Sequence, residues 1–160
     1  MKLTSVRIKN FKSIKDSGEI FFSGSLFVLA GQNESGKSSI LEALEAYETE
    51  KFDKDNINFE EEQGGNKKQE ILCTYEITQG DDFVKDLQDE LREKFSLEEI
   101  DFLDQSKLER LKSFTICKEY DHKAKNLTLR FNGPTLDILK SALKDKENIK
   151  IDESGSIYEE

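Results

Sequence analysis

The chain has 160 residues, enough for one domain with a buried core, and 36% of them are charged against 35% hydrophobic. No apolar run approaches the ~18 residues of a membrane span, and the N-terminus does not look like a signal peptide, so we expect a cytoplasmic protein without a membrane partner. With His122 as the single histidine, a histidine-based catalytic or zinc site is not expected. Cys73 and Cys117 lie far apart in strand-like runs, which predicts reduced core thiols.

The net charge of −10 is distributed unevenly along the chain. A basic N-terminal edge like this one can help to hold a nucleotide, can face nucleic acid, or can be an ordinary solvated strand edge. The strongly acidic remainder argues against broad nonspecific DNA binding by this chain alone. The first 15 residues hold five basic side chains and no acidic one: Lys2, Arg7, Lys9, Lys12 and Lys15.

The N-terminal stretch predicts two short strands. Residues 1–11 alternate, with Val6 and Ile8 on one face and Arg7 and Lys9 on the other, which indicates a strand with one solvated side. Turn-forming residues then bound a second short strand. In chain order, we expect a turn over 16–18, a strand over 19–22 and a turn over 23–25.

The stretch 26–47 contains the main motif of the sequence. Its apolar run 26–30 predicts a strand covered on both faces. The segment Gly31–Ser38 that follows fits G-x-x-x-x-G-K-[ST], the phosphate-binding P-loop. Behind the loop, apolar residues recur at helical spacing and predict an amphipathic helix. These residues are Ile40, Ala43, Leu44 and Tyr47.

Each residue type in this loop has a chemical role. Gly31 and Gly36 permit backbone angles and close approach that a side chain would forbid. The N–H groups of the loop and of the helix N-terminus form a donor site for anionic oxygens. Lys37 would contact the β- and γ-phosphates, and the Ser38 hydroxyl would ligate Mg²⁺. In this context the motif predicts a nucleotide-phosphate site rather than a strand–turn–helix whose glycines serve packing alone.

The rest of the chain is predicted to be an antiparallel β region with a helical insertion. Its strands alternate between apolar and polar residues, unlike the continuous apolar strands of the parallel sheet that a small-molecule kinase requires. In chain order, we expect a loop over 48–68, a strand over 69–78, the helical insertion over about 80–112, hairpin strands over 113–120 and 126–132, a helix after Thr135 and a hairpin around Ser154–Gly155.

Two segments together resemble a known family. Val6–Ile14 (VRIKNFKSI) followed by Leu29–Leu44 (LAGQNESGKSSILEAL) resembles the N-terminal head segment of the SMC/RecF-type ATPases. These are ABC-type heads that include DNA-repair ATPases and the OLD (overcoming lysogenisation defect) family nucleases. A helical insertion over 80–112, in place of a long coiled coil, looks more like the OLD branch.

The resemblance implies an α/β P-loop NTPase fold, the N-terminal lobe of an ABC-type head that binds ATP and Mg²⁺. Residues 1–48 would supply the entry strands, the P-loop and the first helix, and 69–160 an antiparallel β-subdomain with the insertion. By position, Lys12 and Ser13 would lie near the nucleotide. The residues expected around the phosphates are Gly31, Asn33, Glu34, Ser35, Gly36, Lys37, Ser38 and Ser39, with Ser38 on the metal.

Other parts of such heads have no counterpart in this sequence. No signature loop is found, and Asp152 follows a stretch too polar to be the buried strand that carries the Mg²⁺-side acid. We therefore expect an N-terminal piece of a larger protein, with little or no hydrolysis by this chain alone.

In full-length form, the protein is expected to couple ATP binding and hydrolysis to DNA binding, repair or cleavage, as a homodimer or higher oligomer through its heads. Such proteins serve DNA repair or phage defence. The alternative is a non-catalytic interaction or dimerisation module with a structural nucleotide site.

Overall fold

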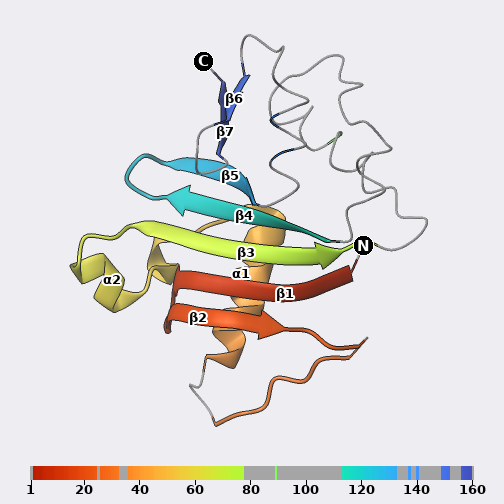
Figure 1. Ribbon diagram of the computed structural model, residues 1–160. Helices are drawn as coiled ribbons and strands as arrows, with labels where there is room; N and C mark the ends of the chain where they lie inside the picture. The colour runs from red at the N-terminus through yellow and green to blue at the C-terminus, as the bar shows by residue number, and fades with distance from the viewer. Residues whose placement is uncertain are drawn as a thin grey trace. The chain divides into compact units, whose positions relative to one another are not determined.

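The computed structural model of the protein describes residues 2–24, 26–32, 36–77, 89, 113–132, 137, 140, 149–151 and 156–159. These ranges form a five-stranded sheet with the order β2-β1-β3-β4-β5 and a two-stranded sheet of β6 and β7 (Figure 1). The chain divides into two compact units. One consists of Thr4–Cys73 and Cys117–Thr128, and we call it the P-loop unit; the other consists of Met1–Leu3, Thr74–Ile116 and Leu129–Glu160.

The predicted entry strand is confirmed as β1 (Lys2–Phe11), which pairs antiparallel with β2 (Ile14–Phe21) through a two-residue turn, Lys12–Ser13. The turn predicted over 16–18 is wrong, because these residues lie inside β2, where the register with β1 shifts. Gly18 takes a φ of +63° there, and the Ser17 hydroxyl accepts the Ile8 N–H at 2.9 Å. A bulge of this kind keeps the strand paired while it absorbs one extra residue.

The helix predicted after the P-loop is confirmed as α1 (Lys37–Thr49), which lies behind β1 and β3 in Figure 1. Ala43 and Tyr47 of its predicted apolar face are buried, as is Ala46, while Ile40 and Leu44 are half-buried. On β1, the alternation is confirmed because Val6 and Ile8 are fully buried. Burial of this helix stripe against alternate strand residues forms the core of the P-loop unit.

The irregular loop predicted over 48–68 instead contains two short helices, η1 (Lys54–Asn56) and α2 (Phe59–Gln63). Asp53 caps η1 and Asn58 caps α2 with their side-chain oxygens, so local side-chain bonds satisfy the first backbone donors of each turn. These caps were present in a polar, glycine-bearing stretch that lacks the apolar periodicity of a longer helix.

The antiparallel strands predicted after this segment are confirmed as β3 (Lys68–Glu76), β4 (Ser113–Asp121) and β5 (Asn126–Asn132), whose neighbours run in opposite directions in Figure 1. Cys73 and Cys117 are free, buried thiols, as predicted. The terminal hairpin is confirmed as β6 (Ile149–Ile151) and β7 (Ile157–Glu159). The predicted insertion over 80–112 and the helix after Thr135 lie outside the described residues, apart from isolated helical positions.

The buried strand predicted over 26–30 is wrong for this structure. Leu26, Phe27 and Val28 are 80%, 42% and 72% exposed, and no strand pairing is found at the described positions 26–32. A strand of this composition is stable only when neighbours pair with it and cover it. The five-stranded sheet ends at β2, and the apolar run continues away from it (Figure 1).

Candidate functional site

Gly36, the second glycine of the P-loop motif, is the N-cap residue of α1. Gly36 has φ 85° and ψ 5°, the left-handed conformation that glycine adopts without a steric penalty. The Gly36 carbonyl accepts the Ile40 N–H at 3.1 Å, which closes the first helical turn. Gly36 has no side chain that could cap this turn, and an anion is the complementary ligand for such a helix end.

Lys37 and the two serines after it differ in their contacts and in their exposure to solvent. The Lys37 ammonium donates to the backbone carbonyls of Gly31, at 2.8 Å, and Gln32, at 2.5 Å. Ser38 is exposed, whereas Ser39 is buried. The remaining predicted loop residues, Asn33, Glu34 and Ser35, lie outside the described residues.

The Lys12–Ser13 turn lies beside this helix start, although the two are more than twenty residues apart in sequence. The hydroxyl oxygens of Ser13 and Ser39 are 3.1 Å apart, and a Cβ placed on Gly36 would lie 3.3 Å from the Ser13 hydroxyl. The Lys12 ammonium forms an ion pair with Glu42 on the second turn of α1. The structure therefore places the two residues singled out by the family resemblance next to the P-loop glycine.

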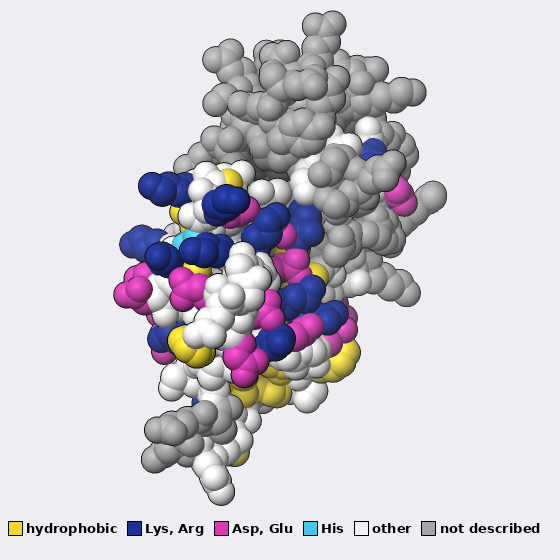
Figure 2. All heavy atoms as spheres, turned by 90° about the vertical axis from the view of Figure 1, so that its left-hand side faces the viewer, with side chains coloured by type: hydrophobic (Ala, Val, Ile, Leu, Met, Phe, Trp, Pro, Cys, Tyr) yellow, Lys and Arg dark blue, Asp and Glu magenta, His cyan; other side chains and the backbone are white. Residues whose placement is uncertain are grey.

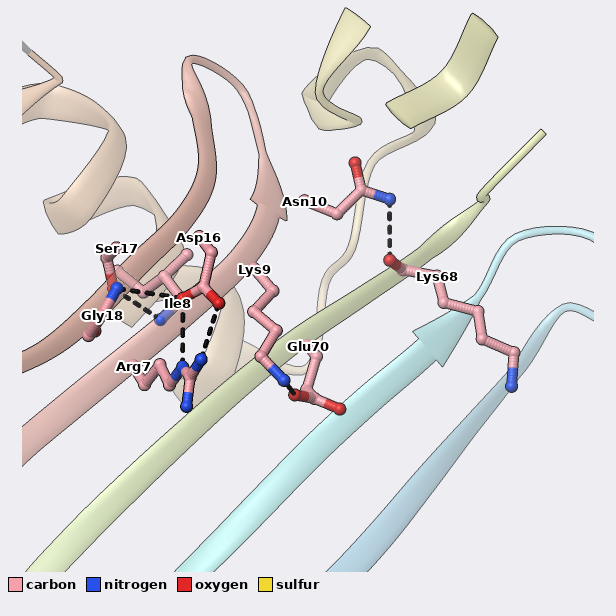
Figure 3. Close-up of polar contacts among 9 residues, drawn as sticks. All are labelled: Arg7, Ile8, Lys9, Asn10, Asp16, Ser17, Gly18, Lys68 and Glu70. Carbon is pink, nitrogen blue, oxygen red and sulfur yellow. Dashed lines mark hydrogen bonds and ion pairs between the residues drawn. The ribbon is translucent and has the colours of Figure 1, made fainter. Parts of the chain in front are cut away.

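Several functional candidates were missed in the sequence, and they belong to an amide network under this turn. Asn10 is 2% exposed with a φ of 55°, and its side-chain Nδ2 donates to the Lys68 carbonyl at 2.7 Å (Figure 3). Its Oδ1 accepts the Asn58 N–H at 2.9 Å. The Asn58 Nδ2 in turn donates to the Lys12 carbonyl at 2.7 Å. The sequence signal for Asn10 was the preference of asparagine for left-handed backbone.

The network extends to His122, the only histidine. The Gln69 amide donates to the Asn56 carbonyl at 2.8 Å, and its oxygen lies 2.7 Å from His122 Nε2. Burial lowers the pKa of His122. Because the Gln69 oxygen can only accept, Nε2 of the ring is the donor in this contact. His122 therefore has a structural contact, where the sequence analysis assigned it no role.

The opposite face of the β1–β2–β3 sheet carries cross-strand ion pairs. Figure 3 shows two of these ion pairs. Arg7 Nη2 lies 2.7 Å from Asp16 Oδ2, and Lys9 Nζ lies 2.6 Å from Glu70 Oε1. The Arg7 guanidinium and the Gly18 N–H together lower the pKa of Asp16 to about 2. Lys15 lies within 4 Å of carboxylates on α2 as well. These pairings favour a solvated sheet face over an open nucleic-acid surface for the basic N-terminal residues.

At the end of the sheet seen in Figure 2, basic and acidic side chains are interspersed across the described residues. This mixture also favours a solvated surface over a nucleic-acid surface. A hollow of about 380 Å³ lies over the charged face, between Lys9, Lys15 and Lys68 and the carboxylates opposite them. Among the residues that the structure describes, no group of three or more His, Cys, Asp or Glu side chains is arranged to hold a metal ion. Likewise, none of the described helices is both long and apolar enough to cross a membrane.

A glycine-bounded loop that leads into α1, with a lysine and a serine on the first helical turn, defines a P-loop nucleotide-binding protein of the α/β class. The chain belongs to the family of AAA ATPase domains, whose model matches residues 1–159. The members of this family are nucleotide-binding ATPase domains, and Mg²⁺ is the usual companion of the nucleotide in the family.

A curated relative comes from the archaeon Methanocaldococcus jannaschii. The uncharacterised protein MJECL44 of this organism is 36% identical over 106 residues, which make up 63% of this chain and 32% of the relative. The chain therefore spans about a third of the length of this relative.

Proposed function

We propose that this chain is the ATP-binding portion of an SMC/RecF/OLD-like ATPase. The observation that carries the proposal is the position of the Lys12–Ser13 turn, with the Ser13 hydroxyl 3.1 Å from that of Ser39 at the start of α1. That placement joins the two segments on which the family resemblance rests, the entry strand and the P-loop. Membership of the AAA ATPase family supports nucleotide binding. The assignment to the SMC/RecF/OLD branch is part of this proposal.

The residues around the helix start have separate roles in this proposal. When the nucleotide binds, the Lys37 ammonium leaves the carbonyls of Gly31 and Gln32 and neutralises the β- and γ-phosphates. It does so because an ammonium ion binds phosphate more strongly than it binds neutral carbonyls. The exposed Ser38 hydroxyl would be this loop's ligand for a Mg²⁺ ion that accompanies the phosphates. Lys12, which forms an ion pair with Glu42, and Ser13, whose hydroxyl lies beside that of Ser39, contact the nucleotide near the start of α1.

For the full-length protein we propose that ATP binding and hydrolysis drive head association and are coupled to DNA binding, repair or cleavage. This chain spans about a third of the length of its relative, and we propose that the DNA contacts come from parts of the full-length protein outside this chain. The sequence offers neither a signature loop nor a Mg²⁺-side acid on a buried strand. Hydrolysis by this chain alone is therefore expected to be near background.

Isothermal calorimetry with ATP, in the presence and absence of Mg²⁺, tests the nucleotide site directly. We expect Mg²⁺-dependent binding that Lys37→Ala abolishes, because the phosphates lose their principal counter-charge. The matched control is Lys51→Ala, which removes an exposed lysine just beyond the other end of α1 and leaves binding unchanged. Equal affinity of wild type and Lys37→Ala would contradict the assignment of the P-loop.

A further inference from the structure

The backbone on both sides of Phe11 has an unfavourable conformation. Asn10 and Lys12 have φ values of 55° and 49°, in the left-handed region that residues with a Cβ rarely occupy. Such a conformation persists only where surrounding contacts compensate its cost. The contacts made by Lys12 therefore indicate what the fold gains by holding this turn.

Both polar groups of the Lys12 backbone are bonded to residues between the last residue of η1 and the cap of α2. The Lys12 N–H donates to the Asn56 carbonyl at 2.6 Å, and the Lys12 carbonyl accepts the Asn58 side-chain Nδ2 at 2.7 Å. Asn58 is only 8% exposed, so solvent does not compete effectively with this bond. These two bonds fix the peptide groups from which the Lys12 and Ser13 side chains project.

Asn58 is itself held in place by Asn10. The Asn10 oxygen accepts the Asn58 N–H at 2.9 Å, while its Nδ2 bonds to the Lys68 carbonyl at 2.7 Å on β3. The turn is thus attached through two buried amide side chains to the strand next to β1 in the sheet. On its other side, the turn contacts the first two turns of α1 through Ser13 and Lys12.

We propose that Asn58 is a positioning residue for nucleotide binding, which sets the Lys12–Ser13 turn at the start of α1 before the ligand arrives. The N–H and side chain of Asn58 bond to Asn10, Glu61 and the Lys12 carbonyl, and it acts on the turn through that carbonyl. Preorganisation of this kind strengthens binding because the turn does not have to be ordered when the nucleotide binds. The inference rests on the proposed function, in which this turn contacts the nucleotide.

The central test compares Asn58→Asp with wild type in calorimetry with Mg²⁺-ATP. Aspartate keeps an oxygen that can cap α2, where Asn58 accepts the Glu61 N–H at 3.4 Å, but it has no N–H for the Lys12 carbonyl. We expect the dissociation constant to rise by about threefold to tenfold, the value of one hydrogen bond. Asn58→Ser, whose hydroxyl oxygen can also cap α2, is the second variant if the aspartate prevents folding.

Asn66→Ala is the matched control. Asn66 lies between α2 and β3, and its side chain bonds to Glu61 and to the Lys68 N–H rather than to Lys12. We expect this variant to bind Mg²⁺-ATP as wild type does. An equal loss of affinity in Asn66→Ala and Asn58→Asp would show general loosening of the segment and would overturn the proposal.

A purely structural role is separated by a mutant cycle. In a Lys12→Ala/Ser13→Ala background, adding Asn58→Asp should no longer change nucleotide affinity, while its effect on the melting temperature should persist. Wild-type affinity in Asn58→Asp, or an undiminished loss of affinity in that background, would overturn the positioning role. Failure of wild type itself to bind Mg²⁺-ATP would instead overturn the proposed function, and the inference with it.

Discussion

At the scale of single residues, Gly36 is a position where a side chain would be poorly tolerated. Two independent constraints act on it, a φ of +85° and the Ser13 hydroxyl at 3.3 Å from a hypothetical Cβ. The first is a conformational cost that any left-handed residue would share. The second is particular to the site, because the Ser13 hydroxyl would have to move by a few tenths of an ångström.

Gly36→Ala is therefore predicted to reduce both stability and Mg²⁺-ATP affinity. The stability loss should be about 1–2 kcal/mol, the cost of a left-handed residue with a Cβ. Gly65→Ala is the matched control, since Gly65 has a φ of +84° with nothing within 4 Å of its Cβ position. Urea denaturation should give similar losses for the two variants, whereas calorimetry should give weaker nucleotide binding for Gly36→Ala alone. Normal binding by Gly36→Ala would show that the turn can move without consequence.

Residue-scale features of the site were partly predictable from the sequence. Gly36 and Lys37 follow from the motif, since the spacing of glycine and lysine is dictated by phosphate geometry. The local signal of Asn58 is only that of a helix cap, and Glu42 has none, because their partners at the turn, Lys12 and Asn10, lie far away in sequence. Only the folded chain brings such pairs together.

At the scale of elements, α1 is held at both ends. Its N-terminus contacts the Lys12–Ser13 turn, and its C-terminal end contacts Lys118 of β4. The Lys118 ammonium lies 4.7 Å from the centre of the Tyr47 ring and 2.8 Å from Glu50, with the residue only 7% exposed. A cation in this position also complements the negative end of the helix dipole.

Lys118→Ala is predicted to destabilise the fold by about 1–3 kcal/mol, because it removes a buried aliphatic stem as well as the cation over Tyr47. Glu50→Gln should cost less, about 1 kcal/mol or below, since Glu50 is partly exposed and its pair is screened by water. Urea denaturation of both variants and of Lys118→Met, which keeps the stem, measures the packing and charge contributions separately. A larger loss for Glu50→Gln than for Lys118→Ala would mean that charge dominates over packing.

The elements themselves were predicted well where periodicity was strong. β1, β3, β4, β5 and α1 all show regular apolar spacing, which reflects one buried face. The bulge in β2 was mistaken for a turn, because Ser17–Gly18 has the composition of a turn and only pairing with β1 distinguishes the two. The short helix α2 depends on the Asn58 cap rather than on periodicity.

At the scale of the whole molecule, the run 26–30 shows that the composition of a segment does not by itself decide whether the segment is buried. Leu26 and Val28 belong to a segment whose composition suits a fully covered strand, yet both are mostly exposed. Such a segment is normally found at an interface or within a larger sheet. Its composition was readable in the sequence; its partners were not.

The exposed state of this run leads to a stability prediction. Leu26→Ser/Val28→Ser should change the free energy of unfolding of this chain by no more than about 0.5 kcal/mol, as expected for exposed positions. Ile71→Ser, at a fully buried position of β3, should cost several kcal/mol as the matched comparison. Denaturation curves give both values. A large loss in the double variant would place the run in a buried strand after all.

The same bonds that hold the Lys12–Ser13 turn also have a consequence for the order of folding. The Asn10 bond to Lys68 spans 58 residues and the Asn58 bond to Lys12 spans 46, so neither can form until a long loop has closed. Local events, such as the winding of α1, precede closures of this length. A nascent or partly unfolded chain can therefore present its glycine loop without the turn beside it, and full nucleotide affinity becomes a property of the completed fold.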